Sequence, residues 1–410
     1  MNWLTAPAHH RWLESETIRL LDFGAASLEP RGGFGWLDAG GVLESTKDTA
    51  LWITCRMTHV YALATMMGRP GAAALVDHGL DALVGRLHDD VHGGWHAAVG
   101  PSGPTDSTKE AYGHAFVILA AASATAAGRP GARELLEDAL AVHTERFWDE
   151  DAGMSRESFS ADWSQGEEYR GINANMHTVE AYLAAADVIN DKAYLHRALR
   201  ICTRAVNDFA RGHQWRLPEH FDTAWNPDLG YHKDTPTHSF RPYGATIGHW
   251  FEWARLTVQL ASSLQQAGLA SPDWMVPAAR ALYDSGVRDG WNVDGAAGFV
   301  YTVDWDGSPV VRERMHWVAA EAIAAAAVLW HKTKAQVYAV HYQQWWDFVG
   351  QYHLDSEGGS WWHELAADNT VSGTVWEGKA DIYHAVRATL IPRLPVTPAL
   401  AASLAGANLD

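Results

Sequence analysis

Two kinds of helical segment alternate along the chain. Five long segments rich in alanine and leucine are apolar on nearly every face and lie at 49–67, 110–127, 176–189, 244–266 and 317–330. Helices of that kind are buried. Between them lie segments that combine charged residues with apolar residues three and four positions apart, at 74–88, 133–147, 193–209, 274–287 and 336–352. This spacing predicts amphipathic helices, so we expect an inner and an outer layer.

A turn rich in glycine and aromatic residues separates each outer helix from the next inner helix. The turns recur about every 60 residues and contain Gly33, Gly94, Gly153, Gly212, Gly298 and Gly359. One longer step includes residues 216–243, which we interpret as an inserted loop. Six helix pairs predict an all-α fold, an (α/α)6 barrel, with an open solenoid as the alternative. We expect one catalytic domain at 1–393 and a peripheral tail at 394–410.

The ends of the inner helices have candidate capping residues. Ser45 or Thr46 and Ser107 or Thr108 are candidate N-caps, because their hydroxyl oxygens accept hydrogen bonds from free backbone N–H groups. Gly68 and Gly128 are candidate ends of the first two inner helices.

Composition narrows the choice of partners. The chain has 49 acidic and 31 basic residues and a formal net charge of −18, which argues against nucleic acid or an anionic membrane as a partner. Cys55 and Cys202 lie in apolar segments and are expected to be reduced. The longest apolar run, at 322–330, is too short to cross a bilayer, and the first residues lack the pattern of a signal peptide. We therefore expect a cytoplasmic protein. The sequence makes no prediction of oligomeric state.

Histidine and tryptophan are unusually abundant, with 22 and 21 copies. One histidine falls near the start of each inner helix: His59, His114, His177, His249, His316 and His384. Acidic residues follow three to five positions later, as in His177 with Glu180 and His249 with Glu252. A carboxylate at that offset can orient an imidazole and raise its basicity. Arg56 adds a fixed cation that can stabilise an oxyanion.

These residues allow other interpretations. Each histidine by itself could be a hydrogen-bonded helix residue, above all His59, His114 and His316. Two histidines and a carboxylate could also bind a metal, but there is no His-Glu-x-x-His string, so we expect none. The tryptophans of the turns, which include Trp36, Trp95, Trp361 and Trp376, could fill the rim of the barrel or stack on a sugar. No phosphate-binding loop or dinucleotide fingerprint is present, so no cofactor is expected.

Five separated motifs resemble one family. They are Leu51-Trp52-Ile53-Thr54-Cys55-Arg56-Met57-Thr58-His59, Asn173-Ala174-Asn175-Met176-His177, Gly248-His249-Trp250-Phe251-Glu252-Trp253, Met315-His316-Trp317 with Glu321, and Gly378-Lys379-Ala380-Asp381-Ile382-Tyr383-His384. Together they resemble the N-acylglucosamine 2-epimerase superfamily, in particular its aldose–ketose isomerase branch and, within that branch, the D-mannose isomerases.

The resemblance implies an (α/α)6 barrel and metal-independent proton transfer on an open-chain monosaccharide. It implies catalytic roles for Arg56, His177, His249, Glu252 and His384. It implies that Glu252 and Glu321 are supporting acids, and that the sugar is bound by Tyr112, Asn173, Trp317, Glu321 and Trp376. His177 would assist ring opening, and His384 would move a proton from C2 to C1 through a cis-enediolate. His249, held by Glu252, would move the proton between the sugar oxygens, and Arg56 would stabilise the oxyanion.

The expected reaction is the interconversion of D-mannose and D-fructose. A sugar 2-epimerase or a sulfoquinovose isomerase of the same superfamily would use the same parts. An inverting glycoside hydrolase on the same barrel is an alternative from another class, with candidate acids Asp106, Glu110, Glu252 and Glu321. A non-catalytic sugar-binding or scaffolding solenoid is a further alternative.

Overall fold

The chain divides into two compact units. The computed structural model describes residues 2–406. Unit 1 comprises Met1–Phe23, Cys202–Lys379 and His384–Thr397, and unit 2 comprises Gly24–Ile201, Ala380–Tyr383 and Pro398–Asp410. Residues 407–410 of the predicted tail lie outside the described residues. The division into one domain at 1–393 and a peripheral tail stays a prediction.

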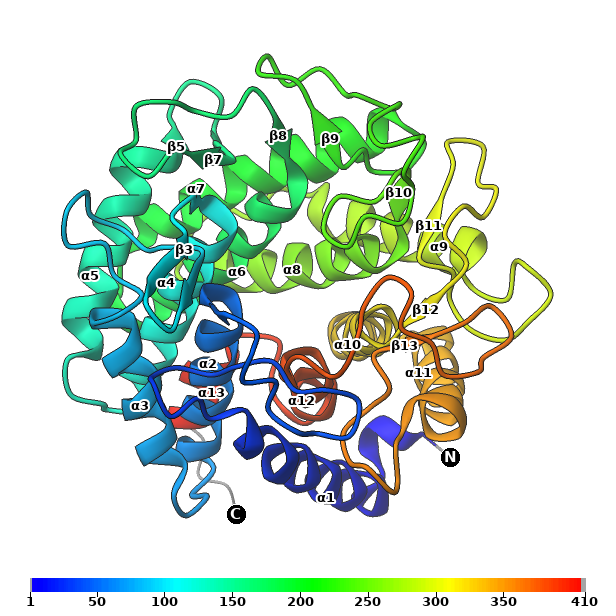
Figure 1. Ribbon diagram of the computed structural model, residues 1–410. Coiled ribbons are helices and arrows are strands. Elements are labelled where there is room, and N and C mark those ends of the chain that lie inside the picture. Colours follow the sequence, from blue (N-terminus) through cyan, green and yellow to red (C-terminus); the bar gives the residue numbers. More distant parts are fainter. Residues whose placement is uncertain (1, 407–410) are drawn as a thin grey trace. The chain divides into compact units, whose positions relative to one another are not determined.

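Unit 2 is built around three buried helices. Its helices are α2 (Leu51–Met66), α3 (Ala72–Val84), α4 (Ala111–Ala126), α5 (Ala132–Val142), α6 (Ile172–Ile189), most of α7 (Lys192–Cys202), and α13 (Leu400–Gly406). Figure 1 shows α2, α4 and α6 in the blue to green part of the chain, and α4 packs against both of the others. The outer helices α3 and α5 pack on α2 and α4, and α13 contacts α2, α4 and α6. Thirteen residues of α2 are buried, as its apolar composition predicts.

Unit 1 repeats the same pairing. Its helices are α1 (Pro7–Gly24) up to Phe23, α8 (Ile247–Gln266), α9 (Met275–Gly290), α10 (His316–Thr333), α11 (Gln336–Phe348), and α12 (Tyr383–Leu390) from its second residue. The inner helix α8 packs against α10, while the outer helices α9 and α11 pack on α8 and α10. Every predicted inner and outer helix is therefore present, and its ends lie within a few residues of the expected positions.

Short strands precede the inner helices. Within unit 2, β1 (Thr49–Ala50) pairs with β2 (Ala98–Gly100) and β2 with β3 (Gly103–Asp106), β4 (Lys109–Glu110) pairs with β7 (Ser158–Phe159), and β5 (Trp148–Asp149) with β6 (Met154–Ser155). Within unit 1, β10 (Ala245–Thr246) pairs with β11 (Thr302–Val303), and β12 (Arg314–Met315) pairs with β13 (Glu364–Leu365). Two further strands are β8 (Arg170–Gly171) in unit 2 and β9 (His220–Phe221) in unit 1. The strands β1, β4, β8, β10 and β12 each end where an inner helix begins.

The strands correct the predicted N-caps. Helices α2 and α4 begin after Ala50 and Glu110, and neither residue makes a side-chain cap. Instead, the backbone N–H groups of Leu51 and Ala111 donate to carbonyls of Ala97 and Glu157 in neighbouring hairpins. Since the hairpins supply these acceptors, the hydroxyl caps predicted at Ser45 or Thr46 and Ser107 or Thr108 are wrong.

Glycines with positive φ mark the repeats. Gly33, Gly94, Gly153, Gly298 and Gly359 have φ between +65° and +107°, a conformation that costs glycine little. Gly212 does not share it, so the fourth turn of the series differs from the others. Gly68 and Gly128 also have positive φ and lie two positions after the last residues of α2 and α4, which confirms the predicted helix ends.

Three outer helices continue into π-helical turns. These turns are His143–Phe147, Thr203–Ala210 and Val349–His353, and shorter 3-10 turns occur at Trp3–Thr5, Ala25–Ser27 and Ile391–Arg393. Each π-helical turn brings its chain toward the next glycine turn. The prediction of helix as far as 147, 209 and 352 therefore included these turns.

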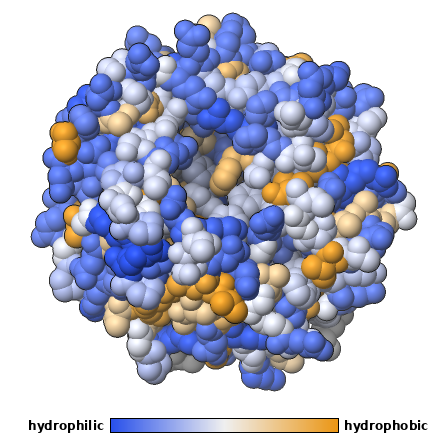
Figure 2. Space-filling model, viewed as in Figure 1, coloured by the Kyte–Doolittle hydropathy of each residue, from blue (hydrophilic) through white to orange (hydrophobic). Residues whose placement is uncertain are grey.

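The face of the molecule drawn in Figure 2 is largely polar. Hydrophilic residues dominate it, and hydrophobic ones form small separate groups. In the part of the chain from residue 2 to residue 406, no helix has both the length and the apolar character needed to cross a membrane. Cys55 and Cys202 are buried and not disulfide-bonded.

Candidate active site

Four buried charged side chains form a cluster in unit 1. We call Glu252, Arg255, Glu321 and Arg387 the carboxylate–arginine cluster. Arg255 donates from Nη2 to Glu252 (2.9 Å) and from Nε to Glu321 (3.0 Å). Arg387 Nη1 lies 3.5 Å from Glu252 and 3.7 Å from Glu321. Helix α8 supplies the first two residues and α10 and α12 one each, so the cluster depends on three inner helices.

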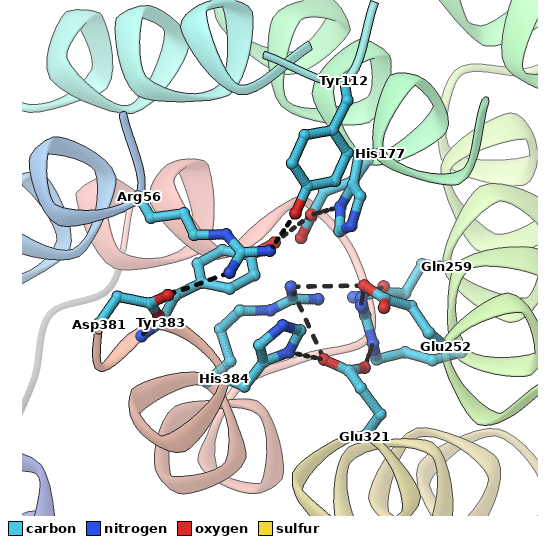
Figure 3. A network of polar contacts seen from close by, with 12 residues as sticks. Arg56, Tyr112, His177, Glu252, Gln259, Glu321, Asp381, Tyr383 and His384 are labelled. Atoms are coloured by element: carbon cyan, nitrogen blue, oxygen red, sulfur yellow. Dashed lines mark hydrogen bonds and ion pairs between the residues drawn. The ribbon is translucent and has the colours of Figure 1, made fainter. Parts of the chain in front are cut away.

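His384 lies on this cluster. Its Nδ1 contacts the carboxylate of Glu321 in Figure 3, at 3.0 Å from Oε1. The histidine is buried. A carboxylate at Nδ1 favours the tautomer that leaves Nε2 free to accept a proton. The sequence pairs Glu321 with His316, and the resemblance implies that it is a supporting acid and binds the sugar. The structure places its carboxylate between His384 and the two arginines, and its contact with the sugar stays a prediction.

His249 has a partner that the sequence did not reveal. Its Nδ1 lies 2.9 Å from Oε2 of Glu219, which precedes β9 in the inserted segment. The hydrogen bond at Nδ1 of His249 is made by Glu219, while Arg255 and Arg387 engage the carboxylate of Glu252. A role of Glu252 in holding His249 stays a prediction. Burial lowers the pKa of His249, but the carboxylates of Glu219, Glu252 and Glu321 together outweigh burial, so the net pKa is raised.

Trp317 connects the two histidines. Its ring centroid lies 5.2 Å from that of His249 and 5.7 Å from that of His384. The aromatic face is half-buried, so it can support an apolar face of a ligand between the two imidazoles. Trp376, the other predicted tryptophan contact, packs on Phe240 of the inserted segment at 5.0 Å.

In unit 2, Arg56 is held by two acceptors. It donates from Nη1 to Asp381 (3.0 Å) and from Nη2 to the hydroxyl of Tyr112 (2.8 Å), as Figure 3 shows. Burial works against the charged form, but Tyr112, Asp381 and Tyr383 raise the pKa of Arg56 above its ordinary value. Arg56 is therefore a permanent buried cation.

His177 and Glu180 lie one helical turn apart on α6. His177 Nδ1 is 3.5 Å from Oε2 of Glu180, as the spacing predicts. The hydroxyl of Tyr383 donates to the same carboxylate. Asn173 lies one turn before His177, and its buried Oδ1 has no hydrogen-bond partner among the described residues. This face of α6 therefore has an acceptor ready for a ligand hydroxyl.

The other repeated histidines are held by the fold. Burial lowers the pKa of His59 to about 4, and its Nδ1 is hydrogen-bonded to Ser123. Burial likewise lowers the pKa of His114 to about 3, and its ring contacts Glu110 O and Trp95 N. His316 is stacked on His363 at 3.9 Å. These contacts agree with the interpretation of His59, His114 and His316 as hydrogen-bonded or packed helix residues without a catalytic role.

With this geometry established, comparison with known proteins decides the family. The family model described as N-acylglucosamine 2-epimerase matches residues 32–388, most of the chain. The chain belongs to the N-acylglucosamine 2-epimerase family. The resemblance that the five motifs indicate is thereby confirmed.

Members of this family with assigned names agree. The chain is 51% identical to a D-mannose isomerase of Thermobifida fusca, covering 98% of each chain. It is 49% identical to a D-mannose isomerase of Pseudomonas cannabina pv. alisalensis, covering 99% of this chain and 97% of the relative. A crystal structure of a D-mannose isomerase superposes with a TM-score of 0.88 at 27% identity, over 95% of this chain and 99% of the other. The (α/α)6 fold class is confirmed, and the protein is an isomerase.

Several partners in this family site were not predicted from the sequence. Glu219 meets His249, and Arg255 and Arg387 meet Glu321, only through the tertiary fold. Arg255 did carry a signal, since it follows Glu252 by three positions on a helix predicted to be apolar all round. A buried cation in such a helix requires an anion nearby. Glu219 lies in a segment that we interpreted only as a loop, so no periodicity indicated it.

The two carboxylates of the cluster, together with His384, have a spacing that a metal could use. Glu252, Glu321 and His384 offer ligand atoms within 4.8 Å of one another. Arg255 and Arg387 already balance the charge of both carboxylates. This donor set therefore fits an ion-pair cluster better than a divalent cation.

Gly248 provides the space that Trp317 occupies. A Cβ at this position would lie 2.2 Å from a ring carbon of Trp317. Gly248→Ala should therefore displace the ring and lower the free energy of unfolding by about 1–3 kcal/mol, measured by chemical denaturation. Gly212→Ala is the matched control, because a Cβ added at Gly212 would meet no heavy atom within 4 Å. Equal effects of the two substitutions would contradict this account of Trp317.

Proposed function

We propose that the protein interconverts D-mannose and D-fructose. Two relatives of about half identity over nearly the whole chain are named D-mannose isomerase. The observation that supports the chemistry is the pair His249 and His384. Each imidazole is hydrogen-bonded at Nδ1 to a buried carboxylate, and both rings pack near Trp317. Two such imidazoles provide the acid and the base that an enolisation requires.

The proposed reaction moves one proton between carbons and one between oxygens. His384 removes the C2 proton of open-chain mannose, and the electron pair of that bond forms the C1=C2 double bond. The π electrons of the C1 carbonyl move to O1, which takes a proton from His249. His249 then accepts the O2 proton as the C2 carbonyl forms, and His384 returns its proton to C1. Both histidines end in their starting states, and no redox cofactor is needed because the electrons stay within the sugar.

Unit 2 supplies the remaining roles in this proposal. His177, beside Glu180, assists ring opening by proton transfer at the ring oxygen. Arg56 stabilises the oxyanion, and Tyr112 and Asn173 contact hydroxyl groups of the sugar. These assignments are supported by the family resemblance and by the local geometry of α2, α4 and α6. Trp317, Glu321 and Trp376 complete the proposed set, and a cytoplasmic location stays a prediction.

The hydrolase alternative fits the carboxylates less well. The ligand oxygens of Glu252 and Glu321 lie within 4.8 Å of each other and both contact Arg255. Inverting glycosidases need about 6.5–9.5 Å between their carboxyl groups, to leave room for a water. The pair therefore lacks the separation that such a mechanism requires.

One experiment tests the proposal directly. The protein is treated with EDTA and incubated with D-mannose in deuterium oxide, and the products are identified by NMR. We expect fructose, with solvent deuterium at C1 where proton exchange competes with transfer. Complete loss of activity on chelation would contradict a metal-independent reaction.

A substrate screen separates the alternatives. Mannose, lyxose, glucose, N-acetylglucosamine, cellobiose and sulfoquinovose are compared at equal concentration. Fructose from mannose as the fastest reaction supports the proposal. Formation of glucose from mannose would indicate a 2-epimerase. Fastest turnover of sulfoquinovose would indicate a sulfoquinovose isomerase, and release of monosaccharide from cellobiose would indicate a hydrolase. No turnover of any sugar would favour the non-catalytic scaffold.

A further inference from the structure

The two candidate acid–base histidines have the same kind of contact. His249 Nδ1 lies 2.9 Å from Glu219, and His384 Nδ1 lies 3.0 Å from Glu321. All four side chains are buried and belong to unit 1. If this were the whole environment, the two imidazoles would hold protons about equally well.

The carboxylates of Glu219 and Glu321 differ in the other residues that they contact, apart from the histidines. Glu321 is shared, since Arg255 donates to it at 3.0 Å and Arg387 lies 3.7 Å away. Glu219 has no arginine or lysine partner in the described part of the chain, and its Oε1 is buried without a hydrogen bond. The full negative charge of Glu219 is therefore directed at His249, whereas that of Glu321 is divided.

The remaining charged and titratable neighbours strengthen this difference. Glu252 and Glu321 also lie near enough to His249 to favour its charged form, in addition to Glu219. His384 has Glu252 as well as Glu321 within 4.8 Å, but both of these carboxylates are paired with Arg255 and Arg387. His316 lies 6.4 Å from His384 between ring centroids, and burial holds its pKa well below the ordinary value, so it adds no charge there. Arg387, on the same helix as His384, brings a permanent positive charge to Glu321. Opposite charges stabilise an imidazolium and like charges destabilise it.

We propose that Glu219 and the pair Arg255 and Arg387 are positioning residues that keep His249 protonated and His384 neutral before the sugar reacts. This inference rests on the proposed function, in which His384 must begin as the base and His249 as the acid. It identifies the residues that decide which histidine has which role. Reversal of the two charge states would leave no base at C2 and no acid at O1.

Glu219→Gln tests the first half, because glutamine keeps the shape and removes the charge. The upper limb of the pH profile of kcat/KM reports the proton of His249. Without Glu219 that proton is held less tightly, so the upper limb should move to lower pH by at least about one unit while the lower limb stays in place. Glu219→Asp keeps the negative charge, so its upper limb should lie close to that of the wild-type protein.

The matched control is Glu16→Gln. Glu16 is equally buried in unit 1, but it bonds to Arg19 and Trp361 and to neither histidine. Its removal should leave both limbs in place. An upper limb that does not move in Glu219→Gln, or that moves equally in Glu16→Gln, would overturn the role of Glu219.

Arg255→Gln tests the second half. Loss of this cation leaves more of the Glu321 charge for His384, so the lower limb should rise by about one unit. Glu252 and Glu321 also face His249, so the upper limb should not fall. Arg255→Lys retains the charge and should keep the lower limb near its original pH. If Arg255→Gln does not fold, a lower limb in Arg255→Lys that rises by a full unit would overturn the proposal, since the charge is still present.

A measurement without turnover separates this inference from the proposed function. The ring signals of labelled histidine are titrated by NMR, with His249→Asn to assign His249. A lower pKa of His249 in Glu219→Gln supports the inference even if no sugar reacts. An unchanged value overturns it even if the wild-type protein converts mannose to fructose.

Discussion

Replacing His384 with alanine should lower kcat on D-mannose by at least about a thousand-fold. His384 is the imidazole that contacts the carboxylate–arginine cluster, with Nδ1 held by Glu321. In the proposed reaction it carries the proton from C2 to C1, and alanine has no group that could accept that proton. Steady-state kinetics with D-mannose measures the effect, and exchange of the C2 proton with deuterium oxide should be lost as well.

The control for this variant is His196→Ala, since His196 is an exposed histidine on α7. It should retain wild-type kcat. A His384→Ala protein that folds normally, binds sugar and keeps more than about a tenth of the wild-type kcat would exclude His384 as the base.

Arg56→Lys should lower kcat/KM by about a hundred-fold with little loss of stability. Arg56 uses two nitrogens of its guanidinium, one for Asp381 and one for Tyr112. Lysine keeps the positive charge, but its compact ammonium cannot reproduce the fork that fixes the cation in place. The positive charge is then displaced from the oxyanion that it should stabilise. Steady-state kinetics measures the loss of kcat/KM, and thermal unfolding shows whether the variant is still folded.

Arg133→Lys is the corresponding control on the surface. Arg133 pairs with Glu137 on α5, and both side chains are exposed. This exchange should change neither kcat/KM nor the melting temperature measurably. If Arg56→Lys behaves in the same way, oxyanion stabilisation by Arg56 is rejected.

The repeat pattern was a reliable guide to the helices. The apolar segments and the glycine turns predicted the inner helices α2, α4, α6, α8 and α10, because both signals are local and recur in the chain. The N-caps failed for the opposite reason. The acceptors for the first N–H groups of α2 and α4 come from hairpins near Ala97 and Glu157, which the local sequence at residues 45 and 107 does not contain.

The histidines of the site were predictable from the sequence, but the carboxylates that contact them were predictable only in part. His177 and Glu180 are one turn apart on one helix, so their contact follows from helical geometry. His249 and Glu252 have the same spacing, yet Glu252 lies with Arg255 and Arg387. A spacing of three positions allows two residues to meet, but competing charges on other helices decide whether they do.

The sequence by itself determined the all-α repeat, the family and the residue types of the site, because periodicity and short motifs are written in neighbouring positions. Only the tertiary structure decided which charge each histidine faces. Glu219 reaches His249 across 30 positions, and Glu321 reaches His384 across 63. Electrostatic interactions act through space, so the distribution of protons between two otherwise similar histidines depends on contacts that no stretch of sequence contains.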